Sequence, residues 1–450
     1  MRFVGLSIVA VLLLARPVGA QAEHVVVVLL DDVGVNKVVS YNDPEAWRTP
    51  TLDAMAAGGV RFTKAYANPT CSPSRAAMLT GRYGSRTGVD TGLPTYHPDT
   101  EPEGDFVPAA THPWLAQRLS AAGVRSYLVG KWHLNHVLQP LYHQDPIAKG
   151  FVRWRGHLSN FTDSQDEGYY HWQKQAADPL GWTETTSVTY ATVDSVTEGL
   201  LALQASAGRR SLVWLALNAP HAPWDDMPPA GTFTLQGGTQ TSAKRYEYML
   251  ESADTLLGQL RSYYASALPA DAAATTWIVM GDNGTPAAAN QSQPPHQHKG
   301  TVYEGGVHVP LIVCGAAVVA PGRTSDHLVH GVDLWATVQE LLDVPVGPRP
   351  IVDSLSFAGV LGNPAAPAAR SAVYVRHGSP NGPGPKDWLE HGAHDGRWWL
   401  LERTGVSPAF ELFDLQADPQ QLSNLWPPDP GLEQVAVDQL QAVIDASSGP

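Results

Sequence analysis

The sequence predicts an α/β fold with one large domain and a smaller C-terminal subdomain. The first reason is the run His24–Leu30, whose apolar and β-branched residues are typical of a strand buried on both faces. The second is that three further apolar runs each lead into polar residues, as expected at the ligand-binding edge of an open α/β sheet. The third is the accumulation of glycine and proline from Val346 to Pro367, which separates these runs from short alternating segments.

Length and composition agree with this division. The 450 residues exceed what a single small domain needs, and with 43% hydrophobic and 16% charged residues the chain can bury a sizeable core. The formal net charge is -14. Because an acidic surface repels nucleic acid and anionic lipid, neither is an expected partner.

The N-terminus is predicted to be a secretory signal peptide, residues 1–22. Arg2 gives a positive start, Val4–Ala15 is nearly all apolar, and small residues follow at a plausible cleavage site. The apolar run is short for a membrane span, which needs about 20 residues. An uncleaved anchor is the alternative. We expect an exported protein, periplasmic or secreted, that has no membrane contact after cleavage.

The remaining elements follow in chain order. In the large domain we expect helices at Pro50–Gly58 and Thr111–Gly123, and strands at Ser126–Val129, Ser211–Leu217 and Thr276–Met280. In the C-terminal subdomain we expect a small antiparallel sheet from Ala372–Arg376, Arg397–Glu402 and Phe410–Asp414, and a helix at Val435–Ala446. The large domain should span residues 23–350 and the subdomain residues 351–450.

Polar residues follow four of the predicted strands. Asp31-Asp32 and Asp282-Asn283 each close an apolar run, and such paired oxygen ligands suit calcium or magnesium. Lys131 with His133, and His221, follow two other strands. Because ligands bind beyond the carboxyl ends of strands in open α/β sheets, we expect these groups to meet at one edge.

The two cysteines differ in their surroundings. Cys314 ends the apolar run Val309–Val313 and is expected to be a small buried residue, although an exported protein could pair the two in a disulfide. Cys71 precedes Pro73, a residue suited to the first turn of a helix. Helix N-termini favour anions, so together with Arg75 we expect this setting to lower the pKa of the Cys71 thiol.

Residues 71–82 read C-S-P-S-R-A-A-M-L-T-G-R and match the pattern C-x-P-S-R-x-x-x-L-T-G-R. This pattern is the signature of the type I sulfatases, within the alkaline phosphatase superfamily, which the chain therefore resembles. The remaining similar segments are Thr49–Asp53, Gly59–Phe62, Gly130–His133, Asn218–Pro223, Gly281–Gly284, Lys299–Pro310 and Phe410–Leu415. The resemblance implies a large mixed β-sheet flanked by helices on both faces, with a smaller C-terminal subdomain that holds a short antiparallel sheet and a helix.

The resemblance also implies the chemistry. In this family a formylglycine-generating enzyme oxidises the signature cysteine to an aldehyde, whose hydrate attacks the sulfate monoester and forms a sulfo-enzyme intermediate. Carried over to this sequence, the metal ligands would be Asp31, Asp32, Cys71, Asp282 and Asn283, and the cation would be Ca²⁺ rather than Mg²⁺. The catalytic residues would be Cys71, Arg75, Lys131, His133, His221 and Lys299. Arg75 and Lys131 would hold the nucleophile, His133 would act on the hydrate, and His221 and Lys299 would bind sulfate and assist the leaving oxygen.

Two other functions remain open at this stage. One is a phosphonate or phosphate ester hydrolase of the same superfamily, because similar oxyanions suit similar sites. The other is a catalytically silent binding protein on a sulfatase scaffold, which would have lost an essential side chain. The substrate alcohol, a carbohydrate or a phenol, would be read by the segment Leu134–Trp182 and the C-terminal subdomain. Trp132, Trp154 and Trp224 could form a wall for it.

Overall fold

The computed structural model describes residues 23–93, 114–135, 142–161, 167–291, 293–346, 353–382 and 384–449. The predicted signal peptide lies outside these residues, so the signal and export stay predictions. Within the described ranges, no helix combines the length and the apolar character needed to span a bilayer.

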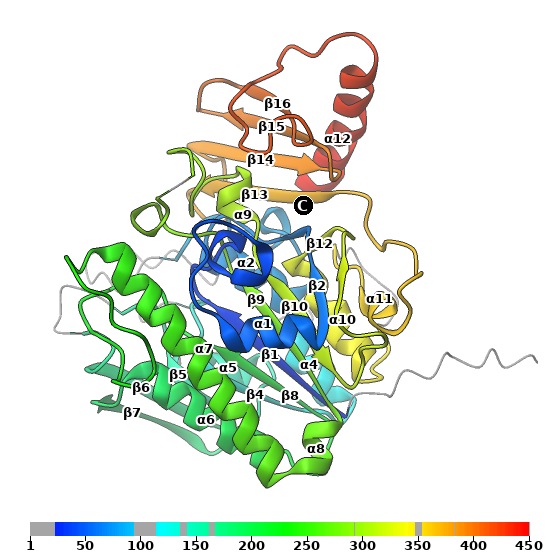
Figure 1. Ribbon diagram of the computed structural model, residues 1–450. Helices are drawn as coiled ribbons and strands as arrows, with labels where there is room; N and C mark the ends of the chain where they lie inside the picture. Colours follow the sequence, from blue (N-terminus) through cyan, green and yellow to red (C-terminus); the bar gives the residue numbers. More distant parts are fainter. Residues whose placement is uncertain are drawn as a thin grey trace, which may run out of the picture.

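A mixed ten-stranded sheet forms the centre of the large domain, in the order β11-β2-β10-β9-β1-β8-β4-β5-β6-β7 (Figure 1). Neighbouring strands from β9 to β5 are parallel, whereas β10 and β6 run antiparallel to their neighbours. The strands are β1 (His24–Leu30), β2 (Gly59–Phe62), β4 (Arg125–Lys131), β5 (Arg153–His157), β6 (Trp172–Asp178), β7 (Gly181–Ser187), β8 (Ser211–Ala216), β9 (Thr275–Gly281), β10 (Leu311–Gly315) and β11 (Arg323–Ser325).

Helices cover both faces of this sheet, as the resemblance implied. Alternate residues of β1 point to opposite faces, so Val25, Val27 and Leu29 join one core and the residues between them join the other. The first core lies against α2 (Cys71–Thr80), α4 (Leu115–Ala121), α10 (Leu334–Leu341) and α11 (Ala358–Gly362). The second lies against α1 (Pro50–Ala57), α6 (Ala191–Ala205) and α7 (Ser242–Ala267). Burial on both sides explains why β1 is apolar throughout.

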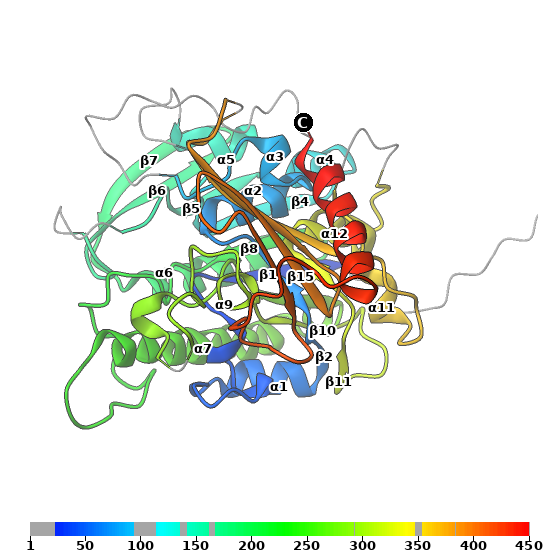
Figure 2. The same cartoon turned by 90° about the horizontal axis from the view of Figure 1, so that it is seen from above.

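The C-terminal subdomain is a four-stranded antiparallel sheet, β13 (Val373–Ser379), β14 (Trp388–His394), β15 (Trp398–Thr404) and β16 (Phe410–Asp414), with α12 (Leu432–Ser448) on one face. In Figures 1 and 2 it lies across the end of the large domain that carries α2 and α9 (Glu304–Val307). Apolar residues of its other face pack against Tyr66, Val302 and Val307. The smaller elements are β3 (Ala65–Tyr66), β12 (Val329–His330), α3 (Gly84–Thr87), α5 (Asp145–Ala148) and α8 (Pro269–Ala273).

The predicted elements agree with the structure, although some of their ends differ and several observed elements were not predicted. The helix expected at Thr111–Gly123 begins at Leu115 among the described residues, and no prediction was made for β5 to β7, α6, α7 or β14. The predicted boundary at residue 350 stays a proposal. Beyond it, Phe357, Val360 and Leu361 still pack in the core of the large domain, which favours a boundary nearer residue 370.

Candidate active site

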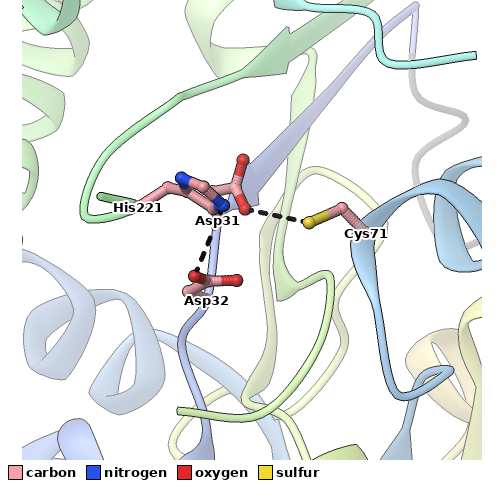
Figure 3. Close-up of side chains that lie close together, drawn as sticks. All are labelled: Asp31, Asp32, Cys71 and His221. Carbon is pink, nitrogen blue, oxygen red and sulfur yellow. Dashed lines mark hydrogen bonds and ion pairs between the residues drawn. The ribbon is translucent and has the colours of Figure 1, made fainter. Parts of the chain in front are cut away.

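The carboxyl ends of four strands and the N-terminus of one helix meet at one edge of the sheet. Asp31 and Asp32 follow β1, Asp282 follows β9, Lys131 ends β4 and His221 follows β8. Asp31 lies beside Cys71, the first residue of α2, whose sulfur is 3.5 Å from a carboxylate oxygen (Figure 3). The structure therefore brings together residues that are far apart in the sequence; Asn283 and Asp32, for example, are 251 positions apart.

The three aspartates are buried and paired with cationic side chains. Arg75 donates from Nε and Nη2 to Asp282 Oδ2, at 3.1 and 2.8 Å, and from Nη2 to Asp31 Oδ2 at 3.2 Å. Lys131 Nζ donates to the same oxygen of Asp31. Arg75 also donates to the Lys131 carbonyl at 3.0 Å, so one guanidinium fixes three strand ends. Burial alone would raise the pKa of Asp31, but Lys131 and neighbouring charges hold it well below its usual range.

The backbone turns sharply at Asp32, where φ is +69°. Aspartate is one of the few residues that tolerates this left-handed conformation. Its N–H donates to Asp282 Oδ1 at 3.1 Å and its carbonyl accepts from the Tyr246 hydroxyl at 2.8 Å. The turn lets adjacent carboxylates of one strand reach the same space, and Lys299 Nζ lies 2.6 Å from Asp32 Oδ1.

Glycine is required where the site loops cross. Gly130 has φ +87°, and a Cβ there would lie 1.9 Å from the Ala216 carbonyl oxygen of the neighbouring strand. A Cβ on Gly284 would lie 2.0 Å from the Gly305 carbonyl oxygen. Close backbone packing at both points positions Lys131 and Asp282 and explains the glycines of the segments Gly130–His133 and Gly281–Gly284.

Cys71 is buried, with a residue exposure of 3%, and every residue of α2 is buried. Burial raises the pKa of the Cys71 thiol to about 12, and the Asp31 carboxylate adds to the effect. The expectation of a lowered thiol pKa was therefore wrong, because desolvation and a nearby negative charge outweigh Lys131 and Lys299 here. Cys314 is a free, buried cysteine in β10, so the small buried residue is confirmed and the disulfide is not formed.

The two histidines each use one ring nitrogen to bind the backbone. His133 Nε2 lies 3.0 Å from the Leu93 carbonyl oxygen, and its buried Nδ1 has no hydrogen-bond partner among the described residues. His221 Nδ1 lies 2.7 Å from the Ala222 carbonyl oxygen, which leaves Nε2 facing Asp32 Oδ2 at 3.8 Å. Burial lowers the pKa of both rings, that of His221 to about 4, so both are neutral near pH 7.

Asp31, Asp32, Cys71 and His221 each place one potential ligand atom within 4.8 Å of all the others (Figure 3). His221 was predicted for the substrate side, so its place in this group is additional. Asn283 Nδ2 donates to Asp32 Oδ1 at 2.8 Å, while its buried Oδ1 lacks a partner within the described ranges. Oxygens of three aspartates and one orphaned amide oxygen make a donor set that fits a hard divalent cation.

Comparison with known proteins identifies the family. The sulfatase family model matches residues 23–344. The chain belongs to the sulfatase family. Mouse arylsulfatase J is 28% identical over 93% of this chain and 75% of its own length. N-acetylgalactosamine-6-sulfatase of pig is 30% identical over 75% of this chain and 65% of its own length, so the chain spans 65% to 75% of the length of these two relatives.

Solved structures of other proteins share the fold of this sulfatase. The crystal structure of Ps i-CgsB has a TM-score of 0.76 at 21% identity, covering 95% of this chain and 94% of the other. The putative sulfatase YidJ of Bacteroides fragilis has a TM-score of 0.77 at 15% identity, covering 97% and 98%. The expected family, fold and enzyme class are confirmed: the protein is a sulfatase, a hydrolase of sulfate esters.

Other predictions about this sulfatase's site were wrong or incomplete. Trp132 and Trp154 are 1% and 0% exposed and belong to the core, so they form no substrate wall, whereas Trp224 is half-buried. Sequence reasoning missed Tyr246 and Tyr169, whose hydroxyls contact the backbone of site residues. No local pattern marks either tyrosine, because each reaches the site from an element remote in sequence.

Proposed function

We propose that this sulfatase hydrolyses a sulfate monoester through an aldehyde hydrate made from Cys71, with Ca²⁺ bound beside it. The observation that carries the proposal is the buried Cys71 thiol within 4.8 Å of carboxylate and imidazole ligand atoms. A thiol whose pKa is about 12 stays protonated near neutral pH, so it is neither a good nucleophile nor a good ligand for a hard cation. Oxidation to formylglycine replaces sulfur with oxygen at that position and removes both difficulties.

The donor atoms and charges of the site suit a divalent cation that would help to bind an anionic substrate. Asp31, Asp32 and Asp282 carry three negative charges, which Arg75, Lys131 and Lys299 balance. A bound Ca²⁺ would be held by the oxygens of these aspartates and of Asn283, with the residue 71 side chain and His221 next to it. It would lower the pKa of a hydroxyl at residue 71 and give the site the positive charge that a sulfate ester needs, despite the acidic protein surface. Mg²⁺ fits less well, because it demands a tighter octahedron.

The protein's own residues would have the following roles in catalysis. A hydrate at position 71 would offer two hydroxyls, one to attack sulfur and one to expel sulfate afterwards. Arg75 and Lys131 hold the carboxylates around it. His133 can accept a proton at Nδ1, because its Nε2–H is committed to the Leu93 carbonyl. His221 and Lys299, with side chains 15% and 21% exposed, would face the substrate. The Lys299 ammonium would neutralise the leaving oxygen, and His221 would assist in the form that carries a proton on Nε2.

A sulfated carbohydrate is the proposed substrate class, with aryl sulfates as alternative substrates. N-acetylgalactosamine-6-sulfatase, by its name, acts on a sulfated sugar, and a structural neighbour was solved with D-glucosamine-2-N,6-O-disulfate. A second was solved with k-i-k-neocarrahexaose. Maturation would need a formylglycine-generating enzyme, and export to the periplasm or outside the cell follows the signal-like N-terminus.

The test is to express the chain with and without a formylglycine-generating enzyme and to digest each batch for peptide mass spectrometry across residue 71. We expect turnover of 4-nitrophenyl sulfate to rise in proportion to the aldehyde fraction. Full activity in a batch whose residue 71 is entirely thiol would refute the mechanism. Parallel assays with 4-nitrophenyl phosphate and a phenyl phosphonate ester separate the sulfatase from the phosphate or phosphonate hydrolase of the same superfamily.

A further inference from the structure

Tyr169 contacts the loop that carries His221 from a distant part of the chain. Its hydroxyl oxygen lies 2.8 Å from the Asn218 carbonyl oxygen and 2.8 Å from the His221 carbonyl oxygen. The side chain is 0% exposed and belongs to the segment before β6, whereas the loop follows β8. One buried hydroxyl therefore joins both ends of the turn Asn218–His221, which the His221 N–H to Asn218 carbonyl bond closes at 2.9 Å.

The loop in turn holds Tyr169. The Tyr169 N–H donates to Asp226 Oδ2 at 2.6 Å, and Asp226 lies five residues beyond His221 on the same loop. Its ring packs against Phe161 at 4.9 Å and stacks on Tyr190 at 5.2 Å between centroids. Contacts through its backbone, ring and hydroxyl hold the Tyr169 side chain in one conformation. It can therefore fix the loop with little further loss of side-chain conformational entropy.

The same turn also touches the cation ligands. The Asp31 N–H lies 3.4 Å from the Ala219 carbonyl oxygen, within the turn that Tyr169 joins. The His221 ring is set by its own bond to the Ala222 carbonyl, so a shift of the turn would move His221 Nε2 relative to Asp32. A small displacement of a group that stabilises a transition state is costly, because its electrostatic benefit depends on preorganisation.

We propose that Tyr169 is a positioning residue that holds His221 against the leaving oxygen of the substrate. This inference rests on the proposed function, since it assigns to Tyr169 an effect that passes through His221. It predicts that loss of the hydroxyl alone impairs the step in which His221 assists departure of the alcohol. Binding of the sulfate group also involves the cation and Lys299, so KM should change little.

The test compares Tyr169→Phe with the matched control Tyr190→Phe. Tyr190 stacks on the same ring and is buried, but among the described residues its hydroxyl makes no hydrogen bond to the turn Asn218–His221. Both variants are assayed as aldehyde-bearing protein, with the aldehyde fraction measured by peptide mass spectrometry. Because a neutral hydrogen bond has a modest net effect, we expect Y169F to lower kcat on phenyl sulfate by about 2- to 12-fold. Its kcat on 4-nitrophenyl sulfate, which has a better leaving group, should fall by less than half that factor, with KM unchanged for both.

The double variant separates positioning from general damage. If Tyr169 acts through His221, adding Y169F to the His221→Ala variant changes kcat by less than about 1.5-fold, because the positioned group is gone. Multiplication of the two single effects would overturn the inference, as would equal behaviour of Y169F and Y190F. Absence of wild-type turnover on aryl sulfates and on glucosamine 6-sulfate would instead refute the proposed function itself.

Discussion

Arg75 offers the sharpest test of the charge arrangement. Its buried guanidinium makes four hydrogen bonds, three to the carboxylates of Asp31 and Asp282 and one to the Lys131 carbonyl. In Arg75→Met the side chain keeps an unbranched stem but lacks the guanidinium, so two buried carboxylates lose that partner. Breaking a buried ion pair in this way costs about 3–5 kcal/mol. With an unfolding entropy of about 2.1 cal/mol/K per residue, a chain of this size should lose about 3–6 °C in Tm without added metal.

Calcium should restore part of this stability. The variant site carries one more net negative charge than the wild-type site, so it should bind the cation more tightly. If affinity rises about tenfold, the calcium-induced increase in Tm should exceed the wild-type increase by about 1–2 °C. Differential scanning fluorimetry with a chelator and with a calcium series measures both quantities. The kcat should still fall by at least about 100-fold, because the cation cannot replace the positioned guanidinium.

Arg370→Met is the matched control. Arg370 has a side chain that is 9% exposed and binds the Asp333 carboxylate, the Tyr83 hydroxyl and the Asp353 carbonyl, away from the site. The Arg370→Met variant should lose a comparable free energy of unfolding, but its calcium-induced increase in Tm and its kcat should equal the wild-type values. Equal calcium increments in all three proteins would refute the charge balance, and an unchanged Tm in R75M would refute the ion pairs.

Three further results are expected. Exhaustive chelation should abolish turnover of the aldehyde-bearing protein, with calcium restoring more activity than magnesium, and full activity in metal-free protein would contradict the assigned cation site. Thr285→Val should lower Tm by about 1–3 °C, and Thr285→Ser by less than half of that, because the threonine hydroxyl donates to Asn36 Oδ1 at 2.7 Å and accepts from Gly34 N–H at 3.2 Å. Burial lowers the pKa of His330 to about 3, so its ring stays neutral in the folded protein. The unfolded chain binds a proton there near pH 6.5, so the free energy of unfolding falls as pH falls from 6.5 toward 3. Between pH 6.5 and 4.5 the free energy of unfolding of His330→Asn should therefore fall by about 2–3 kcal/mol less than that of the wild type, as measured by urea unfolding. The same dependence on pH in both proteins would count against this.

Strands buried on both faces were predictable because their side chains need no alternation. β1, β8 and β9 are continuous apolar runs, and each was predicted within one residue of its observed ends. By contrast, β7 reads G-W-T-E-T-T-S and is largely exposed at the edge of the sheet. β14 contains glycine and two histidines, so local sequence gives little strand signal. The pairing of these strands with their neighbours is a tertiary effect.

The site could be predicted in composition but not in electrostatics. Each polar cluster follows an apolar run, so their meeting at one edge followed from topology. The pKa of Cys71 was given the wrong direction, since the helix N-terminus is visible in the sequence whereas the desolvation and the Asp31 charge are not. The place of His221 among the potential ligand atoms depended on the turn after β8, and the contacts of Tyr169 depended on the packing of a distant segment.

The central position of β1 in the sheet determines how late in synthesis the sheet can form. β1 pairs only with β8 and β9, so His24 meets Ser211 and Thr275, and its sheet cannot form until most of the large domain has been synthesised. Between Cys71 and the start of β9 the ribosome must add 204 residues, the difference between positions 275 and 71. At about 5–20 residues per second this takes about 10–40 s. During that interval the sheet that buries α2 has not formed, so Cys71 would be accessible to an enzyme that modifies it. In the folded protein Cys71 is buried.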